Sequence, residues 1–136
     1  AEKSAHLCRL TLMQALPALA EADIAAFGHA ITQIQRVVGD HFAAAQGGRF
    51  ASPAVAAALD WLQAEGIAGV GQSSWGPTGF AIIGNEVEAR RLLHAARAHW
   101  NKGPLRFMVC AARNQGGEVL VGGRAALGQG RGRGSD

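Results

Sequence analysis

The chain has 136 residues, which is enough for one domain with a hydrophobic core and too few for two domains of ordinary size. Apolar residues account for 49% of the sequence and charged residues for 17%, a low share for a helix-rich protein. Two interpretations remain open: an alanine-rich helical core with ordinary packing, or an apolar face that meets another surface. The net charge is +3, but residues 124–136 hold three arginines and one aspartate. The rest of the chain is nearly neutral, which argues against nucleic-acid binding.

The sequence contains no sign of a membrane segment. No stretch approaches the roughly 18 apolar residues that span a bilayer, and the N-terminus is unlike a signal peptide, so we expect a cytoplasmic protein. Cys8 and Cys110 each lie in an apolar neighbourhood without Cys-x-x-Cys spacing, which predicts two buried free thiols. The five histidines have no spacing typical of a zinc site, and we expect no metal ligands.

The first 39 residues predict two helices that pack antiparallel. Apolar residues recur near helical spacing from Glu2 to Ala20, where Pro17 is expected to kink or restart the helix. Asp23 is a predicted N-cap for a second helix that runs to about Val38 and ends at Gly39. Its apolar stripe consists of Ile24, Phe27, Ile31, Ile34 and Val38.

The middle of the chain predicts a loop, a third helix and two strands. Residues 40–50 read as a connecting loop, and Ser52-Pro53 as the start of a helix that runs to Glu65 and closes at Gly66. Short apolar runs at 67–71 and 78–83 predict strands joined by a polar loop.

The C-terminal third predicts a further helix and a last strand. Asn85, with Glu88 three residues later, starts a helix to about Trp100. Leu105 to Ala112 predicts a strand, and residues 114–117 a turn before the apolar piece 119–121. The expected fold is α+β, with helices on one face of an antiparallel sheet. We expect one domain over residues 1–123 and a flexible Gly/Arg-rich tail over 124–136.

The loop between the two predicted strands is the strongest functional candidate. Its glycines allow backbone N–H groups to approach an anion, and its hydroxyls add donors, so a phosphate or carboxylate fits. It lacks the ending of a Walker loop and joins strand to strand, unlike a dinucleotide fingerprint. Gly-x-Ser-x-Gly does not occur, so we discount a hydrolase. The alternative is a glycine-rich hairpin with a buried tryptophan. The candidate residues are Gly71, Gln72, Ser73, Ser74, Trp75, Gly76 and Thr78.

A second candidate loop consists of Gln46, Gly47, Gly48 and Arg49. It combines an amide, a flexible backbone and a guanidinium suited to bidentate contact with a carboxylate or phosphate. An ordinary interhelix turn with a surface arginine is the equal alternative.

The segment Gly71-Gln72-Ser73-Ser74-Trp75-Gly76-Pro77-Thr78-Gly79-Phe80 closely resembles a signature of β-ribofuranosylaminobenzene 5′-phosphate synthases, of the GHMP kinase superfamily. The resemblance covers roughly residues 7–98. It also takes in Leu16-Pro17-Ala18-Leu19, Asp23, Phe27-Gly28, Ile34, Phe42, Gln46-Gly47-Gly48 and Ser52-Pro53. Kinase members usually carry a Ser-Gly-Ala-Gly-Pro type of loop, from which Ser74-Trp75-Gly76-Pro77 departs. This departure favours the synthase over an ATP-binding kinase.

The resemblance implies the ferredoxin-like C-terminal domain of an enzyme of methanopterin-type cofactor biosynthesis. That enzyme condenses phosphoribosyl pyrophosphate with 4-aminobenzoate or 4-hydroxybenzoate, with loss of CO₂ and pyrophosphate. The superfamily's N-terminal phosphate loop does not occur in this sequence. We therefore expect the isolated domain to be inactive, with the N-terminal domain as its partner and a homodimer as one possible assembly.

The expected ligands follow from the same resemblance. No cofactor is expected on this domain alone, and Mg²⁺ would accompany pyrophosphate in the full-length enzyme. The alternatives are the C-terminal domain of an ATP-dependent GHMP small-molecule kinase and a non-enzymatic ferredoxin-like binding module.

Overall fold

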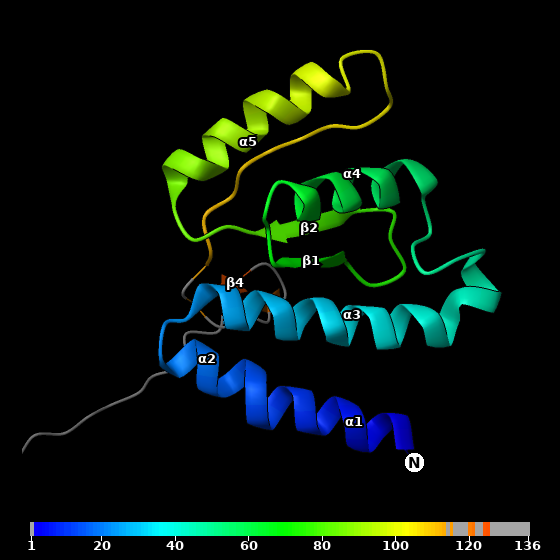
Figure 1. Cartoon of the computed structure of the whole chain (residues 1–136), viewed down its shortest axis with the longest axis vertical. Helices are drawn as coiled ribbons and strands as arrows, with labels where there is room; N and C mark the ends of the chain where they lie inside the picture. The colour runs from blue at the N-terminus through cyan, green and yellow to red at the C-terminus, as the bar shows by residue number, and fades with distance from the viewer. Residues whose placement is uncertain (1, 114, 116–119, 122–123, 126–136) are drawn as a thin grey trace, which may run out of the picture.

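The computed structural model describes residues 2–113, 115, 120–121 and 124–125. Figure 1 shows the N-terminal helix on the outside, followed by a long helix, a β-hairpin and two further helices. The elements are α1 (Glu2–Leu10), a π-helical stretch (Thr11–Ala15), α2 (Leu16–Ala20), α3 (Ile24–Gln46), α4 (Pro53–Ala64), β1 (Gly69–Gln72), β2 (Gly79–Ile82), α5 (Glu86–His99), β3 (Leu120–Val121) and β4 (Arg124–Ala125).

The first helical arm, residues 2–20, is continuous but widens in the middle. The Leu16 N–H donates to the Thr11 carbonyl, one residue further back than in an α-helix. The widened turn lies directly before Pro17, which lacks an N–H and whose ring clashes with the carbonyl four residues earlier in a regular helix. The expected disturbance at Pro17 is therefore confirmed as a π-helical stretch. The arm runs antiparallel to α3, also as expected (Figure 1).

Helix α3 is longer than the sequence predicts. Asp23 caps its start by accepting from the Ala26 N–H at 2.9 Å. The predicted end at Gly39 is wrong, because Gly39 lies inside the helix, and the true end is Gly47, in the left-handed conformation with φ 83°. Gly39 is small for a tertiary reason: a Cβ there would come within 2.6 Å of the Arg49 carbonyl oxygen. The predicted loop over residues 40–50 is thus helical as far as Gln46.

The buried face of α3 consists of small residues, unlike the predicted stripe of large apolar residues. Ile24 and Val38 are exposed, whereas the buried positions are Gly28, Ala30, Thr32 and Gly39. A Cβ on Gly28 would lie 2.6 Å from the Gly69 nitrogen, so α3 approaches the backbone of β1 too closely for larger side chains. The closeness of α3 to β1 explains why small residues, glycine and alanine, occupy this face of the helix.

Strands β1 and β2 form the predicted antiparallel hairpin, with Gly69 opposite Ile82 and Gln72 opposite Gly79. The outer edge of β1 is covered by side chains of α3. The Thr32 hydroxyl donates to the Ala68 carbonyl at 2.7 Å and accepts from the Val70 N–H at 2.9 Å. Gln35 Oε1 accepts from the Gln72 N–H at 3.0 Å. These contacts satisfy edge groups that would otherwise remain open.

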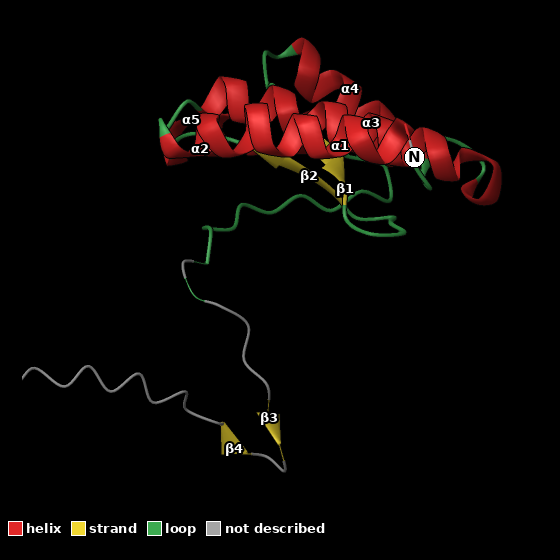
Figure 2. Cartoon of the chain, turned by 90° about the horizontal axis from the view of Figure 1, so that it is seen from below, coloured by secondary structure: helices red, strands yellow, loops and turns green. Residues whose placement is uncertain are grey.

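Helices α4 and α5 begin as predicted. Ser52 and Asn85 accept from the N–H groups of Val55 and Glu88, and the positive φ of Gly66, 94°, follows the end of α4. Seen from below, the helices gather on one side of the hairpin (Figure 2). The α+β fold with helices on one face of an antiparallel sheet is therefore confirmed.

The predicted strand over Leu105 to Ala112 does not form within the described residues. The segment runs back past α5 without joining the hairpin (Figure 1). It is held instead by the Phe107 ring, 5.7 Å from that of Trp100, and by its carbonyl, which accepts from Arg97 at 2.8 Å. A strand-like sequence forms a strand only where a partner edge is available.

Strand β3, in the last residues of the predicted domain, pairs antiparallel with β4, Arg124–Ala125, at the start of the predicted tail. The expected turn at 114–117, apart from Gln115, and the tail from 126 to 136 lie outside the described residues. None of the helices in the described part combines the length and apolar character needed to cross a bilayer.

Candidate functional site

The two predicted loops meet at one cavity of about 190 Å³ beside the C-terminal half of α3. The loop after α3 and the loop after β1 are more than twenty residues apart in sequence, yet both line it. Helix α3 forms the remaining wall. The lining residues are Gln35, Val38, Gly39, Phe42, Gln46, Arg49, Gln72, Ser74 and Trp75.

Gln72 is the residue that joins these parts. Its side chain is 6% exposed, accepts from the Ala51 N–H at 2.7 Å and donates to the Ser74 carbonyl at 3.1 Å. It also donates to Gln46 Oε1 at 3.4 Å, while Gln46 Nε2 donates to the Arg49 carbonyl at 2.9 Å. The amide predicted to face an anion is thus bonded within the protein, where it holds the two loops together.

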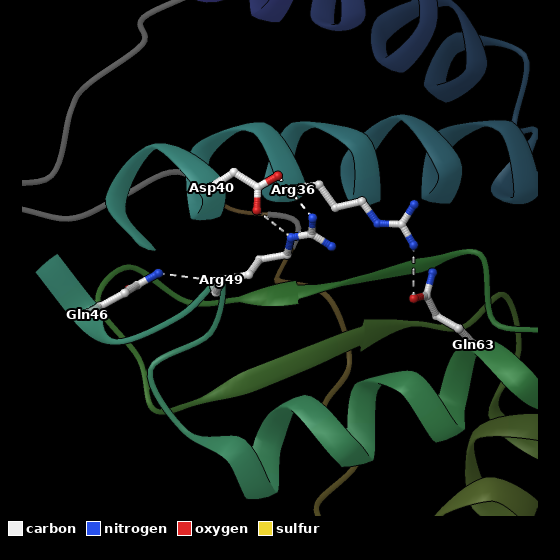
Figure 3. A network of polar contacts seen from close by, with 5 residues as sticks. All are labelled: Arg36, Asp40, Gln46, Arg49 and Gln63. Carbon is white, nitrogen blue, oxygen red and sulfur yellow. Dashed lines mark hydrogen bonds and ion pairs between the residues drawn. The ribbon is translucent and has the colours of Figure 1, made fainter. Parts of the chain in front are cut away.

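Arg49 lies across the last turns of α3 and pairs with Asp40 (Figure 3). Its Nε and Nη2 donate to the two carboxylate oxygens of Asp40 at 2.7 and 3.0 Å. This hydrogen bond holds the pKa of Asp40 below its ordinary value and raises that of Arg49. Nη1 makes no hydrogen bond among the described residues.

The aromatic wall of the cavity is formed by Phe42 and Trp75, whose ring centroids are 5.2 Å apart. The Trp75 side chain is 60% exposed, so the alternative of a buried tryptophan in a structural hairpin is wrong. An exposed indole held against a second ring offers a flat surface on which a planar ligand can stack.

The tip of the loop after β1 is a tight turn. The Ser73 N–H donates to the Thr78 carbonyl at 2.8 Å and the Gly76 N–H to the Ser73 carbonyl at 2.9 Å. Ser74 and Gly76 have positive φ, 52° and 73°. The side chains of Ser73, Ser74 and Thr78 are exposed, and their hydroxyls make no hydrogen bond among the described residues. Three hydroxyls are thus available to a ligand, although only Ser74 of these lines the cavity.

A comparison with protein families finds one family whose model matches most of the chain. The family described as GHMP kinases C terminal matches residues 15–102, which include α2 to α5 and both candidate loops. The chain belongs to the GHMP kinase C-terminal domain family. Neither the curated proteins nor the solved structures contain a match.

The glycines of the GHMP domain's candidate loops serve the local geometry. Gly47 and Gly48 have positive φ, 83° and 156°, where the chain leaves α3. Gly71 is buried in β1, where a Cβ would meet Gln35 and Phe80, and Gly76 lies against Gln72. They allow the close approach of loop and helix that encloses the cavity.

The contribution of α3 to the GHMP domain's site was missed from the sequence, since Gln35 and Val38 were not singled out as site residues. The signal that could have found it is a spacing of three and four residues along α3: Thr32, Gln35, Gly39, Phe42 and Gln46. Such spacing places side chains on one face of a helix. Their non-aliphatic character hid this face from a search for apolar stripes.

The remaining chemistry-bearing residues of the GHMP domain lie elsewhere. Cys8 and Cys110 are exposed, so the prediction of buried thiols is wrong. His99 packs between Trp61 and Trp100, with ring centroids 6.0 and 4.2 Å away. In the part of the chain that the structure describes, no three acidic, histidine or cysteine side chains group as a metal site would require.

Proposed function

We propose that this GHMP domain is the C-terminal part of a β-ribofuranosylaminobenzene 5′-phosphate synthase. The substrates would be phosphoribosyl pyrophosphate and 4-aminobenzoate or 4-hydroxybenzoate, and the products would include CO₂ and pyrophosphate. The observation that carries the proposal is the exposed Trp75 beside Phe42, in a cavity that Arg49 also lines. A planar aromatic acid needs this combination of a stacking surface and a cation.

The benzoate is assigned to the cavity. Its ring stacks on the open face of Trp75, and its carboxylate accepts from Nη1 of Arg49, since Nε and Nη2 are held by Asp40. Charge that develops on the ring during attack on the ribose is stabilised by the indole face.

The phosphate groups of the second substrate are assigned to the tip of the loop. Ser73, Ser74 and Thr78 offer hydroxyl donors without protein partners among the described residues. Donors that point at the leaving pyrophosphate stabilise the negative charge that grows on it in the transition state. Gln72 is given a positioning role, because its side-chain amide already bonds to Ala51, Gln46 and Ser74.

The synthase is preferred to an ATP-dependent kinase because of the loop sequence. Kinase members usually have small residues where Ser74-Trp75-Gly76-Pro77 places an indole. The cavity's donors are amides, a hydroxyl and a guanidinium, and Asp40 is bound to Arg49, so these residues do not fit a protein-held Mg²⁺. The remaining substrate contacts are assigned to an N-terminal GHMP domain in the intact protein.

The test is calorimetric titration of the intact two-domain protein with phosphoribosyl pyrophosphate, each benzoate and ATP. The double variant Ser73→Ala/Ser74→Ala is expected to weaken phosphoribosyl pyrophosphate binding by at least about 100-fold, since it removes two hydrogen bonds to a charged group that contribute about 1.5–3 kcal/mol each. Trp75→Ala is expected to raise the KM for the benzoate while leaving phosphoribosyl pyrophosphate binding unchanged.

Ser4→Ala is the matched control, because Ser4 is an exposed serine on α1 that does not line the cavity. Unchanged activity and affinity in the double serine variant contradict the assigned role. Tight ATP binding with phosphoryl transfer identifies the kinase alternative instead.

A further inference from the structure

A second hollow, the α1–α3 groove, lies between α1 and the C-terminal half of α3 and has a volume of about 660 Å³. Helix α1 packs on the side of α3 that faces away from the hairpin (Figure 1). No lining residue is common to this groove and the cavity beside Trp75, so the two are separate. The polar residues that line the groove are Glu2, Lys3, His6, Arg9 and Asp40.

The basic side chains of the α1–α3 groove all come from α1. Lys3, His6 and Arg9 follow one another at spacings of three residues, which places neighbours on adjoining turns of one side of the helix. All three are exposed, and none forms an ion pair among the described residues. On α5, by contrast, Arg91 pairs with Glu88. The basic row of α1 is therefore available to an anion from outside.

The acidic side of the α1–α3 groove is largely neutralised. Asp40 accepts from Nε and Nη2 of Arg49 with its two carboxylate oxygens, so its charge is already balanced (Figure 3). This hydrogen bond lowers the pKa of Asp40, and the charges of Lys3 and Arg36 lower it further. The carboxyl group of Asp40 thus lies in a positive potential. Glu2 is the other carboxylate among the lining residues.

The length of the basic row indicates which anion fits. Lys3 and Arg9 are six residues apart, which is about 9 Å along a helix axis, and His6 lies midway. A single carboxylate neutralises only part of such a row, whereas two linked phosphate groups can contact both ends. Lysine and arginine both bind phosphate oxygens, and arginine does so through two parallel N–H donors.

We propose that the α1–α3 groove is a second anion site, which binds a small molecule that carries a pyrophosphate group. Lys3 and Arg9 contact the two phosphate groups, and the imidazole of His6 donates a hydrogen bond between them. The site is independent of the function proposed above, since that function uses the cavity beside Trp75 and the loop after β1.

The test is calorimetric titration of the 136-residue chain with inorganic pyrophosphate at low ionic strength, where salt screens exposed charges least. We expect saturable binding. Lys3→Gln/Arg9→Gln is expected to weaken it by at least about tenfold, because two charge-assisted contacts are lost. Glu2→Gln is expected to strengthen it by about twofold to threefold, because a repelling exposed charge is removed.

The matched control is Lys102→Gln/Arg106→Gln, which removes the same charge from two exposed residues outside the groove and should leave the affinity near that of the wild type. Equal weakening by the two double variants identifies a non-specific attraction between charges and overturns the proposal. Absence of saturable binding overturns it as well. Inorganic phosphate should bind more weakly than pyrophosphate, and equal affinities contradict contact with both ends of the row.

The loop variant Ser73→Ala/Ser74→Ala separates this proposal from the proposed function. It should leave pyrophosphate binding to the α1–α3 groove unchanged. If this variant abolishes the binding and Lys3→Gln/Arg9→Gln does not, the anion binds at the loop and the proposed groove site is wrong. The opposite result supports the groove site whether or not the loop binds phosphoribosyl pyrophosphate.

Discussion

Gln72 shows how one side chain can define a site without needing to touch a ligand. It connects the end of β1 to the segments around Ala51 and Ser74, and Gln46 extends the network to Arg49. Its burial makes each of these bonds costly to lose, since an unpaired donor or acceptor away from water is destabilising. The shape of the cavity therefore depends on an amide in its wall.

Replacing Gln72 by leucine should destabilise the domain by about 2–3 kcal/mol, because the Ala51 N–H and the Ser74 carbonyl lose their partner. Urea unfolding followed by circular dichroism measures the change. Ser73→Ala is the control, as its exposed hydroxyl makes no bond among the described residues, and it should lie within about 0.5 kcal/mol of wild type. Equal stabilities of the two variants contradict the role of Gln72.

At the level of elements, α3 organises the molecule. It carries the first helical arm on one side and satisfies the edge of β1 on the other through Thr32 and Gln35. It then runs on through Gly39 to place Phe42 and Gln46 at the cavity. The contact between α3 and β1 depends on close backbone approach at Gly28.

Gly28→Ala should therefore be destabilising by about 1–3 kcal/mol, the usual cost of overpacking. Alanine ordinarily stabilises a helix relative to glycine, by roughly 1 kcal/mol, so the sign of the effect is diagnostic. Thermal unfolding of the variant is the measurement. Gly47→Ala serves as comparison, since nothing lies within 4 Å of its Cβ position and only its left-handed backbone, about 1 kcal/mol, opposes the change. A stabilised Gly28→Ala protein would show that the helix and strand can separate freely.

Local and tertiary signals explain which elements could be predicted. The caps at Asp23, Ser52 and Asn85 were found because their hydrogen bonds join residues three apart in sequence. The end at Gly39 was misplaced because the close approach of Arg49 comes from outside the helix. The strand expected at Leu105 to Ala112 failed for a similar reason, since pairing requires an edge that a local pattern does not reveal.

The candidate site also has a part that local sequence predicts and a part that depends on tertiary contacts. Each candidate loop was recognisable from its residue types, and Trp75 could be singled out by its family resemblance. Their meeting at one cavity depends on α3 continuing past Gly39, which the sequence alone did not indicate. Because the two loops meet, Gln72 bonds to both of them and is not the free ligand contact that the sequence predicts. Gln35 was missed because it lines the cavity from α3, which the sequence did not place there.

For the molecule as a whole, the two ion pairs Arg49–Asp40 and Arg91–Glu88 link stability to pH. Hydrogen bonds from Arg49 and Arg91 lower the pKa values of Asp40 and Glu88 below their ordinary values of 3.8 and 4.5. A lowered folded-state pKa stabilises the fold above the ordinary value, and the contribution is lost as the pH falls through the folded one. Both carboxylates are solvent-accessible, so the effect should be small.

The melting temperature of the domain should therefore stay level from neutral pH to the ordinary carboxyl values and fall below them. Differential scanning calorimetry across this range checks the prediction. Asp40→Asn and Glu88→Gln remove the two contributions, so the double variant should show a weaker acid dependence. Glu2→Gln is the control, because Glu2 makes no ion pair among the described residues. If the melting temperature of the double variant falls with pH as in the wild type, groups other than Asp40 and Glu88 cause the loss of stability in acid.

The three tryptophans occupy two different settings, and this gives the domain an optical label of its own. Trp61 and Trp100 are half-buried and share one aromatic cluster, with ring centroids 5.4 Å apart, whereas Trp75 stands exposed at the cavity. Emission from the exposed indole lies at longer wavelength and is open to quenchers dissolved in water. A compound that covers the cavity must shield this component and leave the cluster's emission unaltered, so occupancy can be read in unlabelled protein.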